Sequence, residues 1–205
     1  MPTTWRGYEL VHESVSVGGR TLVIERPHDA EELLDEEAFE REEFLPYWAE
    51  LWPSALALAD HVASRDLAGL GLVELGCGLA LPGIVAALGG AAVLATDWSE
   101  DALEFVRANA RRNGTEVETL RCSWTSPDPL VARAPFDLVL ASDVLYERRD
   151  VEPLLALLPR LAPEVLLADP GRPTLSDFLE RAAEAWLVER SEPVYRLVGA
   201  PHEAG

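Results

Sequence analysis

The chain has 205 residues, a length that fits one domain and allows a fold to bury roughly 70% of the surface that the unfolded chain exposes. The shares of hydrophobic residues, 48%, and charged residues, 26%, exclude a largely disordered chain. The net charge of -19, with arginine as the only basic residue besides histidine, disfavours general binding of nucleic acids and favours cationic substrates or partners.

Neither a membrane segment nor a metal site is expected. The apolar stretches are interrupted by glycine and stay below the roughly 18 residues that a membrane span requires. Residues 1–8 lack the basic start and the apolar run of a secretory signal, so we expect a cytoplasmic protein. Cys77, Cys122 and the four histidines are scattered without the spacing of metal ligands.

The first 64 residues predict a hairpin followed by helices. Alternating stretches flank Gly18-Gly19 between residues 8 and 25, which indicates a β-hairpin with a two-residue turn. Residues 29–43 are crowded with Asp and Glu and predict one or two short acidic helices with a solvated face. Residues 54–64 have apolar positions at helical spacing, preceded by a proline that a first helical turn tolerates.

The rest of the chain alternates between strand and helix patterns. Strands are predicted at 71–75, 91–95, 116–121, 136–141 and 164–168, and helices at 81–88, 100–113, 151–161 and 175–184. This alternation predicts a parallel sheet with helices on both faces, and two final strands at 186–191 and 194–198 predict an antiparallel finish. The expected fold is therefore α/β, a doubly wound, Rossmann-like and mostly parallel sheet of seven strands.

We expect one domain over residues 1–205, with a hairpin and acidic helical extension at 8–45 and a cofactor-binding core at 46–205. Periodicity does not distinguish an extension that covers the site as a lid from one that extends the edge of the sheet.

Residues 73–83 read as a strand that enters a glycine turn and then a helix. Gly76 and Gly78 allow a ligand to approach the backbone closely, but Leu81 breaks the GxGxxG pattern of nicotinamide-dependent enzymes. Glu74 would repel a pyrophosphate, whereas it suits the amino group of S-adenosylmethionine. The turn therefore favours that cofactor, and the alternative is a tight turn without a ligand.

Asp97 ends the next predicted strand, about 20 residues past the glycines, where an acceptor for ribose hydroxyls is expected. Trp98 is placed to pack on an adenine ring. Taken alone, Asp97 would be a residue at a helix N-terminus and Trp98 a core side chain; their placement together favours the cofactor.

Four motifs resemble those of the seven-strand (class I) S-adenosylmethionine-dependent methyltransferases, which include many protein-lysine methyltransferases. The motifs are Tyr47-Trp48-Ala49-Glu50-Leu51-Trp52-Pro53-Ser54, the turn at 74–83, Asp97-Trp98, and Ser142-Asp143-Val144-Leu145-Tyr146. A fifth stretch, Asp169-Pro170-Gly171-Arg172, looks like that of the lysine methyltransferases that act on the electron-transfer flavoprotein β subunit and of their bacterial relatives. The similarity spans residues 15–198.

The resemblance implies S-adenosylmethionine as cofactor. It implies that Glu74, Gly76 and Gly78 hold its methionine part, that Asp97 holds the ribose, and that Asp143 and Tyr146 face a substrate amine as catalytic residues. Two departures are Ala80, where relatives often have a third glycine, and Ser123, where many have an Asp that contacts adenine. The expected cofactor-binding residues are Trp52, Glu74, Gly76, Cys77, Gly78, Asp97, Trp98, Ser123 and Trp124.

Three classes of function stay open from the sequence: a protein methyltransferase, most readily on lysine; a small-molecule N- or O-methyltransferase; and a non-catalytic binding module with the same fold. The structural alternative for Asp143 is a cap of the following segment, with Tyr146 as a packing residue. Taken alone, Arg172 is expected at the surface more readily than in contact with a substrate, because Asp-Pro-Gly is ordinary turn chemistry, but it stays a candidate for such a contact.

Overall fold

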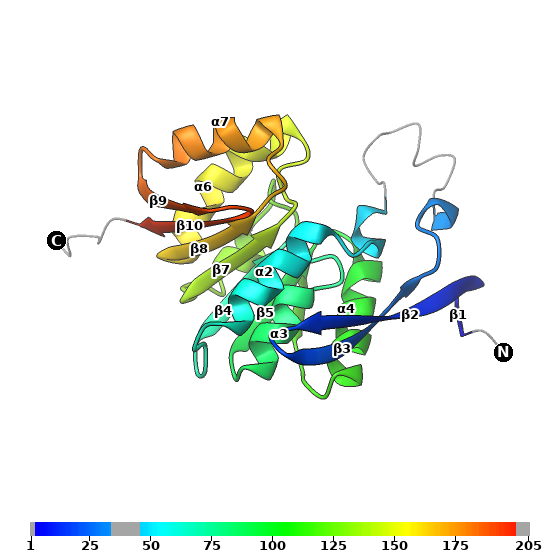
Figure 1. The fold of residues 1–205 in the computed structure, drawn as a ribbon. Coiled ribbons are helices and arrows are strands. Elements are labelled where there is room, and N and C mark those ends of the chain that lie inside the picture. The colour runs from blue at the N-terminus through cyan, green and yellow to red at the C-terminus, as the bar shows by residue number, and fades with distance from the viewer. Residues whose placement is uncertain (1–2, 34–45, 200–205) are drawn as a thin grey trace.

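A seven-stranded sheet forms the centre of the structure, a computed structural model that describes residues 3–33 and 46–199 (Figure 1). The strand order is β6-β5-β4-β7-β8-β10-β9. Neighbours from β6 to β8 are parallel, and β10 is antiparallel to both β8 and β9. The strands are β4 (Gly71–Leu75), β5 (Ala92–Asp97), β6 (Glu118–Arg121), β7 (Leu138–Ser142), β8 (Glu164–Ala168), β9 (Trp186–Ser191) and β10 (Val194–Gly199). The predicted doubly wound sheet with an antiparallel finish is confirmed.

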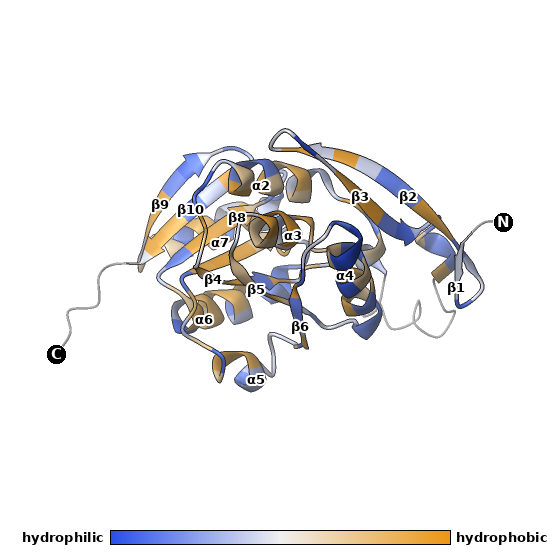
Figure 2. Ribbon diagram, turned by 90° about the horizontal axis from the view of Figure 1, so that it is seen from below, coloured by the Kyte–Doolittle hydropathy of each residue, from blue (hydrophilic) through white to orange (hydrophobic). Residues whose placement is uncertain are grey.

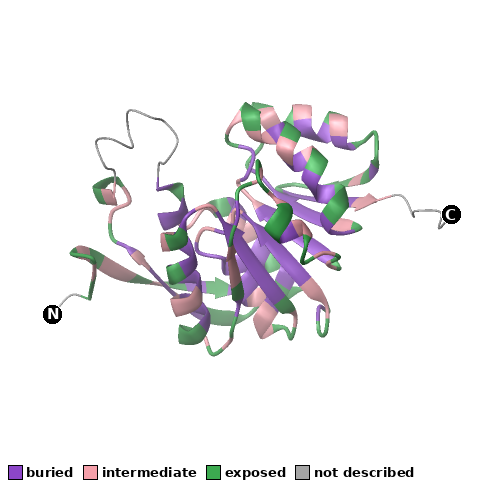
Figure 3. Cartoon of the chain, turned by 180° about the vertical axis from the view of Figure 1, so that it is seen from behind, coloured by how far each residue is buried: buried purple, intermediate pink, exposed green. Residues whose placement is uncertain are grey.

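Helices cover both faces of this sheet, because the side chains of each strand alternate between the faces. Leu72 belongs to a buried apolar cluster shared with α2, α3 and α4, and Val73 to a second cluster shared with α5, α6 and α7. The central strands carry mostly apolar residues (Figure 2) and are buried (Figure 3). The helices are α2 (Pro53–Ala63), α3 (Leu81–Leu88), α4 (Glu100–Arg112), α5 (Asp128–Val131), α6 (Val151–Leu161) and α7 (Pro173–Ala182).

The element boundaries follow the predicted ones within about two residues where the hydrophobic pattern is long. The sequence does not predict the four-residue helix α5 or the two-residue strand β1 (Thr4–Trp5), because elements this short are too short to show a periodic hydrophobic pattern. Of the expected acidic helices at 29–43, the 3-10 turn η1 (Glu31–Leu33) is seen, and residues 34–43 lie outside the described residues. Two further 3-10 turns are η2 (Tyr47–Ala49) and η3 (Arg148–Asp150).

No helix in the described ranges has the length and apolar character that crossing a membrane demands. The 13 residues of α4 span about 20 Å, which is shorter than a bilayer core.

The N-terminal strands form a separate three-stranded antiparallel sheet. The predicted hairpin is confirmed as β2 (Tyr8–Val17) and β3 (Arg20–Pro27), and β1 pairs with β2. Val15 and Ile24 are buried in the cluster that contains α2, α3 and α4, so this sheet packs on the outside of that helix layer. It neither extends the seven-stranded sheet nor, in its described residues, lines the pocket described below.

Two asparagines, Asn109 in α4 and Asn113 at the C-cap of that helix, hold the outer edge of β3. The side-chain amide of Asn109 accepts a hydrogen bond from the N–H of Glu25 (2.7 Å) and donates one to its C=O (3.0 Å). Asn113 makes the same pair of bonds with Val23, both at 2.9 Å. Residues four apart on a helix rise by about 6 Å, close to the roughly 6.6 Å between residues two apart on a strand, so both amides fit.

Candidate active site

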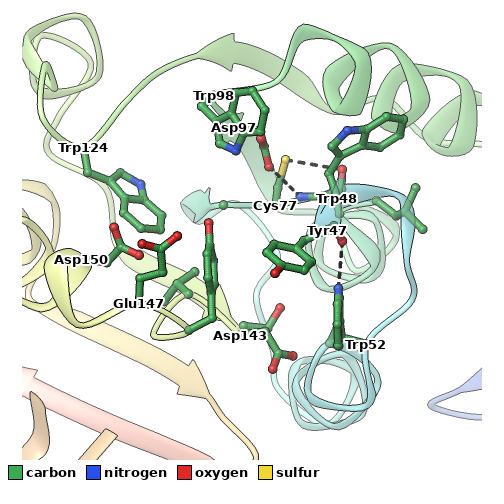
Figure 4. A pocket seen from close by; sticks show the side chains of 18 of the residues that line it. Tyr47, Trp48, Trp52, Cys77, Asp97, Trp98, Trp124, Asp143, Glu147 and Asp150 are labelled. Carbon is green, nitrogen blue, oxygen red and sulfur yellow. Dashed lines mark hydrogen bonds between the residues drawn. The ribbon is translucent and has the colours of Figure 1, made fainter. Parts of the chain in front are cut away.

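A pocket of about 920 Å³ lies at the carboxyl ends of β4, β5, β6 and β7 (Figure 4). β5 and β7 flank β4 on opposite sides, so this is the topological switch point at which open α/β sheets bind ligands. Ten of the residues predicted for the site line the pocket: Trp52, Gly76, Cys77, Gly78, Asp97, Trp98, Ser123, Trp124, Asp143 and Tyr146. Glu74 is not among the lining residues.

The glycine turn after β4 exposes its backbone to the pocket. Gly76 and Gly78 have φ of +56° and +50°, and a Cβ on Gly76 would lie 3.1 Å from Val144 Cγ1 and 3.2 Å from Trp124. Ala80, which stands where relatives often have a third glycine, keeps the left-handed conformation with φ 53°. Ala80 therefore adopts a conformation that glycine adopts more easily, at a cost of about 1–2 kcal/mol in backbone strain.

Glu74 is bonded to the first turn of α3, behind the glycine turn, and does not line the pocket. Its side chain is fully buried, and Oε2 accepts a hydrogen bond from the N–H of Gly83 at 2.8 Å, in the first turn of α3. Burial raises the pKa of Glu74 to about 8, so the side chain is mainly protonated at neutral pH. The expectation that its carboxylate meets the cofactor amino group does not match this placement.

Asp97, the last residue of β5, is an acidic residue that lines the pocket. Its Oδ2 accepts a hydrogen bond from Gly78 N–H (3.0 Å) and its Oδ1 from Ser99 N–H (2.9 Å). Each carboxylate oxygen has a second lone pair, so both retain acceptor capacity. Burial raises the pKa of Asp97, and these hydrogen bonds oppose that shift. Its carboxylate therefore fixes the glycine turn and can still accept from ligand hydroxyls.

Aromatic and small side chains form much of the remaining wall. Trp98 and Trp124 line the pocket with Ser123, whose Oγ lies 2.9 Å from the hydroxyl of Thr125. The pKa of the buried Cys77 thiol is raised by burial, so Cys77 contributes a neutral surface.

Three aromatic rings stand together at the mouth of the pocket. Trp52 donates its indole N–H to the C=O of Tyr47 at 2.9 Å. The rings of Tyr47 and Tyr146 meet edge to face with centroids 5.4 Å apart, and these residues are 43% and 42% exposed. Tyr47 was quoted within a motif but not predicted as a site residue. Its ring contacts with Trp52 and with Tyr146, which comes from a distant segment of the chain, place Tyr47 at the site.

Asp143 lies on the pocket wall on the same side as Tyr47 and Trp52 (Figure 4). It follows β7 in the left-handed conformation with φ 57°, and its Oδ1 accepts a hydrogen bond from Arg172 Nη1 at 2.6 Å. Its Oδ2 is shielded from solvent and has no hydrogen-bond partner among the described residues. Strained residues concentrate at functional sites, and an unpartnered carboxylate oxygen there is a candidate acceptor for a ligand N–H.

Arg172 is the main residue that the sequence misplaced. It lines the pocket with a side chain 24% exposed, and Nη1 bridges Asp143 Oδ1 and Asp169 Oδ2, the latter at 3.0 Å. The expectation of an ordinary surface arginine is therefore wrong. Its place in the Asp-Pro-Gly-Arg stretch was the available signal, but a pairing across 29 residues is not visible in a single sequence.

The opposite wall carries acidic residues that the sequence did not single out. Glu147 and Asp150 lie near Trp124 (Figure 4). Burial, with the negative charge of Glu147, raises the pKa of Asp150 to about 6. Burial and the neighbouring carboxylates raise the pKa of Tyr146 to about 12, so its hydroxyl stays neutral at physiological pH. Arg149 also lines this wall and pairs with Glu147 at 2.6 Å, so the wall combines charges of both signs with the neutral hydroxyl of Tyr146.

The chain was compared with known proteins and structures. The profile of a family described as lysine methyltransferase matches residues 46–178. Human histone-arginine methyltransferase METTL23 is 38% identical over 112 residues, which cover 52% of this chain and 59% of METTL23. Danio rerio protein N-lysine methyltransferase METTL21A is 36% identical over 121 residues, which cover 56% of this chain and 55% of that protein. The match thus covers somewhat more than half the length of these relatives.

The fold also has clear counterparts among solved structures. The T. thermophilus 16S rRNA N2 G1207 methyltransferase (RsmC), in complex with AdoMet and guanosine, superposes with a TM-score of 0.68 over 93% of this chain and 51% of that chain, at 15% identity. At this identity the likeness concerns the fold alone. Because the family profile matches more than half of its residues, the chain belongs to the lysine methyltransferase family, as the motif resemblance predicted.

Proposed function

We propose that this chain is a protein methyltransferase that takes S-adenosylmethionine as cofactor and transfers a methyl group directly to lysine side chains. The observation that carries the proposal is the carboxylate of Asp143 on the wall of the switch-point pocket, whose shielded Oδ2 has no hydrogen-bond partner among the described residues. A carboxylate there suits a cationic or amine acceptor. Membership of the lysine methyltransferase family supports the same choice.

The residues of the pocket fit S-adenosylmethionine. Its cavity of about 920 Å³ has room for a nucleoside-sized ligand and part of an acceptor. The glycine turn brings its backbone to the pocket wall in the left-handed conformation, which suits close approach of the methionine part. The unused lone pairs of Asp97 suit the ribose hydroxyls, and Trp98 and Trp124 offer faces for adenine. Because S-adenosylmethionine has no phosphate, the pocket needs no cluster of basic residues to bind one.

The bound cofactor supplies a methyl group on a sulfonium, which is transferred when the acceptor nitrogen forms a bond to carbon and the carbon–sulfur bond breaks toward sulfur. Asp143 attracts the ammonium form of the acceptor and holds one N–H. The nitrogen lone pair is then aligned once a proton has left to water. The neutral hydroxyl of Tyr146 is placed to fix the direction of that lone pair. The aromatic rings at the mouth limit the access of water.

A protein acceptor is supported by the surface and by the mouth of the pocket. The net charge of -19 attracts a basic protein. Tyr47 and Tyr146, each more than two fifths exposed, offer apolar surface to a side chain that enters from outside. Binding of nucleic acid is not part of the proposal, and cytoplasmic location stays a prediction.

Transfer of labelled methyl groups into an extract tests the proposal. The wild-type protein and Asp143→Asn are each incubated with labelled S-adenosylmethionine and nuclease-treated extract, and acid-precipitable label is separated from soluble label. We expect the wild type to place label in discrete protein bands. In the variant this label should fall at least about a hundredfold. Because the chain has no lysine, methylation of its own lysine side chains does not contribute.

Asp177→Asn is the matched control, because Asp177 lies on α7 and does not line the pocket. Both variants should bind S-adenosylhomocysteine as the wild type does. Label confined to small molecules would replace the protein acceptor by a metabolite, and the absence of cofactor binding would leave a non-catalytic module.

A further inference from the structure

The Arg172 guanidinium is held rigidly beside the proposed acceptor carboxylate. Asp169 holds both the backbone and the side chain of this segment: Oδ1 accepts from the backbone N–H groups of Gly171 and Arg172, both at 2.8 Å, and Oδ2 accepts from Arg172 Nη1 at 3.0 Å. The side chain of Asp169 is fully buried, so this anchor does not move toward solvent. Arg172 therefore reaches Asp143 from a fixed base.

The contact of 2.6 Å between Arg172 and Asp143 places a cation on Oδ1 and leaves Oδ2 as the oxygen of that carboxylate without a hydrogen-bond partner among the described residues. A guanidinium is bound best by two parallel N–H···O bonds to both oxygens of a carboxylate. An ammonium is a compact charge that needs a single oxygen. With one oxygen occupied, Asp143 suits an ammonium and lacks the fork that a guanidinium requires.

The charges point the same way. Asp143 and Asp169 carry two negative charges, and Arg172 cancels one of them, so this triad retains one negative charge for one incoming cation. The shielded Oδ2 has no hydrogen-bond partner in the part of the chain that the structure describes, which is costly for a carboxylate oxygen, so an N–H donor that displaces the shielding side chains relieves this cost.

We propose that Arg172 is a positioning residue that selects lysine over arginine, because it pairs with one oxygen of Asp143 and leaves the other, once it is uncovered, to the acceptor nitrogen. This inference rests on the proposed function. It separates two acceptor classes that family membership leaves together, since the relatives include a protein N-lysine methyltransferase and a histone-arginine methyltransferase.

Binding of two small cations tests the inference without methyl transfer. Butylammonium and propylguanidinium, which mimic the ends of lysine and arginine, are titrated into the full chain with S-adenosylhomocysteine present, and binding is followed by protein-observed NMR. We expect the wild type to prefer butylammonium by about fivefold or more, because a single oxygen is offered.

Arg172→Met removes the guanidinium and frees Oδ1, so the preference should fall by about tenfold or reverse. Arg172→Lys keeps a cation on Oδ1 and should retain the wild-type preference, which a purely structural role would not predict. Arg181→Met is the matched control, because Arg181 pairs with Glu152 outside the pocket and its loss should leave both affinities unchanged.

An equal preference in the wild type would overturn the inference even if Arg172→Met does not fold. An unchanged ratio in a folded Arg172→Met that binds S-adenosylhomocysteine normally would overturn it as well. Hydrolysis of the labelled extract proteins gives an independent readout: methyl-lysine is expected, and methyl-arginine would overturn the inference while protein methylation stands. If the chain prefers butylammonium but transfers no methyl group to protein, the proposed function is contradicted and the inference on Arg172 is not.

Discussion

The two turns that border the pocket, at the ends of the neighbouring strands β4 and β7, use their acidic residues in opposite ways. After β4, the pocket is shaped by backbone in the left-handed conformation at Gly76, Gly78 and Ala80, while Glu74 is buried beneath α3. After β7, one residue has positive φ, Asp143, and its carboxylate lies on the pocket wall.

Under the proposed function, one edge of one sheet therefore specifies a cofactor and an acceptor by different physical means. The cofactor side depends on backbone conformation and on the absence of Cβ atoms. The acceptor side depends on the charge and hydrogen-bonding capacity of side chains. Substitutions in the first turn should therefore affect cofactor affinity, and charge changes near the second should affect the binding of a cationic acceptor.

The largest effect is expected from Gly76→Ala. The new Cβ would lie 3.1 Å from Val144 Cγ1 and 3.2 Å from Trp124, and the residue would keep φ at +56°, which an L-residue adopts at a cost of about 1–2 kcal/mol. We expect a loss of affinity for S-adenosylhomocysteine of about a hundredfold, because relaxation of the turn moves the backbone that faces the ligand. Calorimetric titration measures this affinity.

Gly114→Ala is the matched control for this substitution. Gly114 has φ +78° and no atom within 4 Å of a built Cβ, and it follows α4 outside the pocket. It should show a similar loss of stability with unchanged cofactor affinity. Equal affinities in the two variants would contradict a backbone-specified cofactor site.

Glu74→Gln should sharpen the contrast between the two acids. Burial raises the pKa of Glu74 from 4.5 to about 8, so the folded chain holds its proton more tightly than the unfolded chain. The resulting stabilisation is complete below pH 4.5, declines above it, and is fully lost once the pH has risen through about 8. The variant lacks this titration. Between pH 6 and 8, the free energy of unfolding of the wild type should therefore fall by about 2 kcal/mol relative to that of the variant.

Urea denaturation at several pH values measures this difference. The amide of the variant can still accept a hydrogen bond from Gly83 N–H, so the fold should be retained at pH 6. Parallel stability profiles for the two proteins would show that Glu74 does not titrate in this range.

The smallest effect is expected from Asp150→Asn on the acceptor side. Burial raises the pKa of Asp150 to about 6, so it gains its negative charge as the pH rises through that value. The affinity of the wild type for butylammonium should therefore increase between pH 5 and 7, by about threefold more than that of the variant. An identical pH dependence in both proteins would show that this wall does not contribute to the attraction of cations.

Much of the fold could be predicted because its strands and helices have long hydrophobic patterns. β8 and α6 begin and end where the pattern predicted them. The single turn of α5 and the packing of the hairpin on α4 could not be predicted. The first has too few residues for a period, and the second depends on side chains separated by 84 residues along the chain.

The candidate site could be predicted wherever a residue follows directly from a strand end, as Asp97 and Asp143 do. Glu74 could not be placed, because β4 is buried on both faces and its apolar neighbours Val73 and Leu75 do not indicate which face an acid occupies. Arg172 could not be placed either, because turn residues such as Asp169 and Gly171 give the same pattern at an exposed loop.

The amides of Asn109 and Asn113 also protect the hairpin from pairing with other molecules. An open strand edge offers N–H and C=O groups on which a strand from another chain can assemble into an aggregate. On β3, the groups of Val23 and Glu25 are already satisfied. Exchange of the hairpin between two copies of the chain would first have to break these four hydrogen bonds, so domain swapping through β3 is disfavoured in both its thermodynamics and its rate.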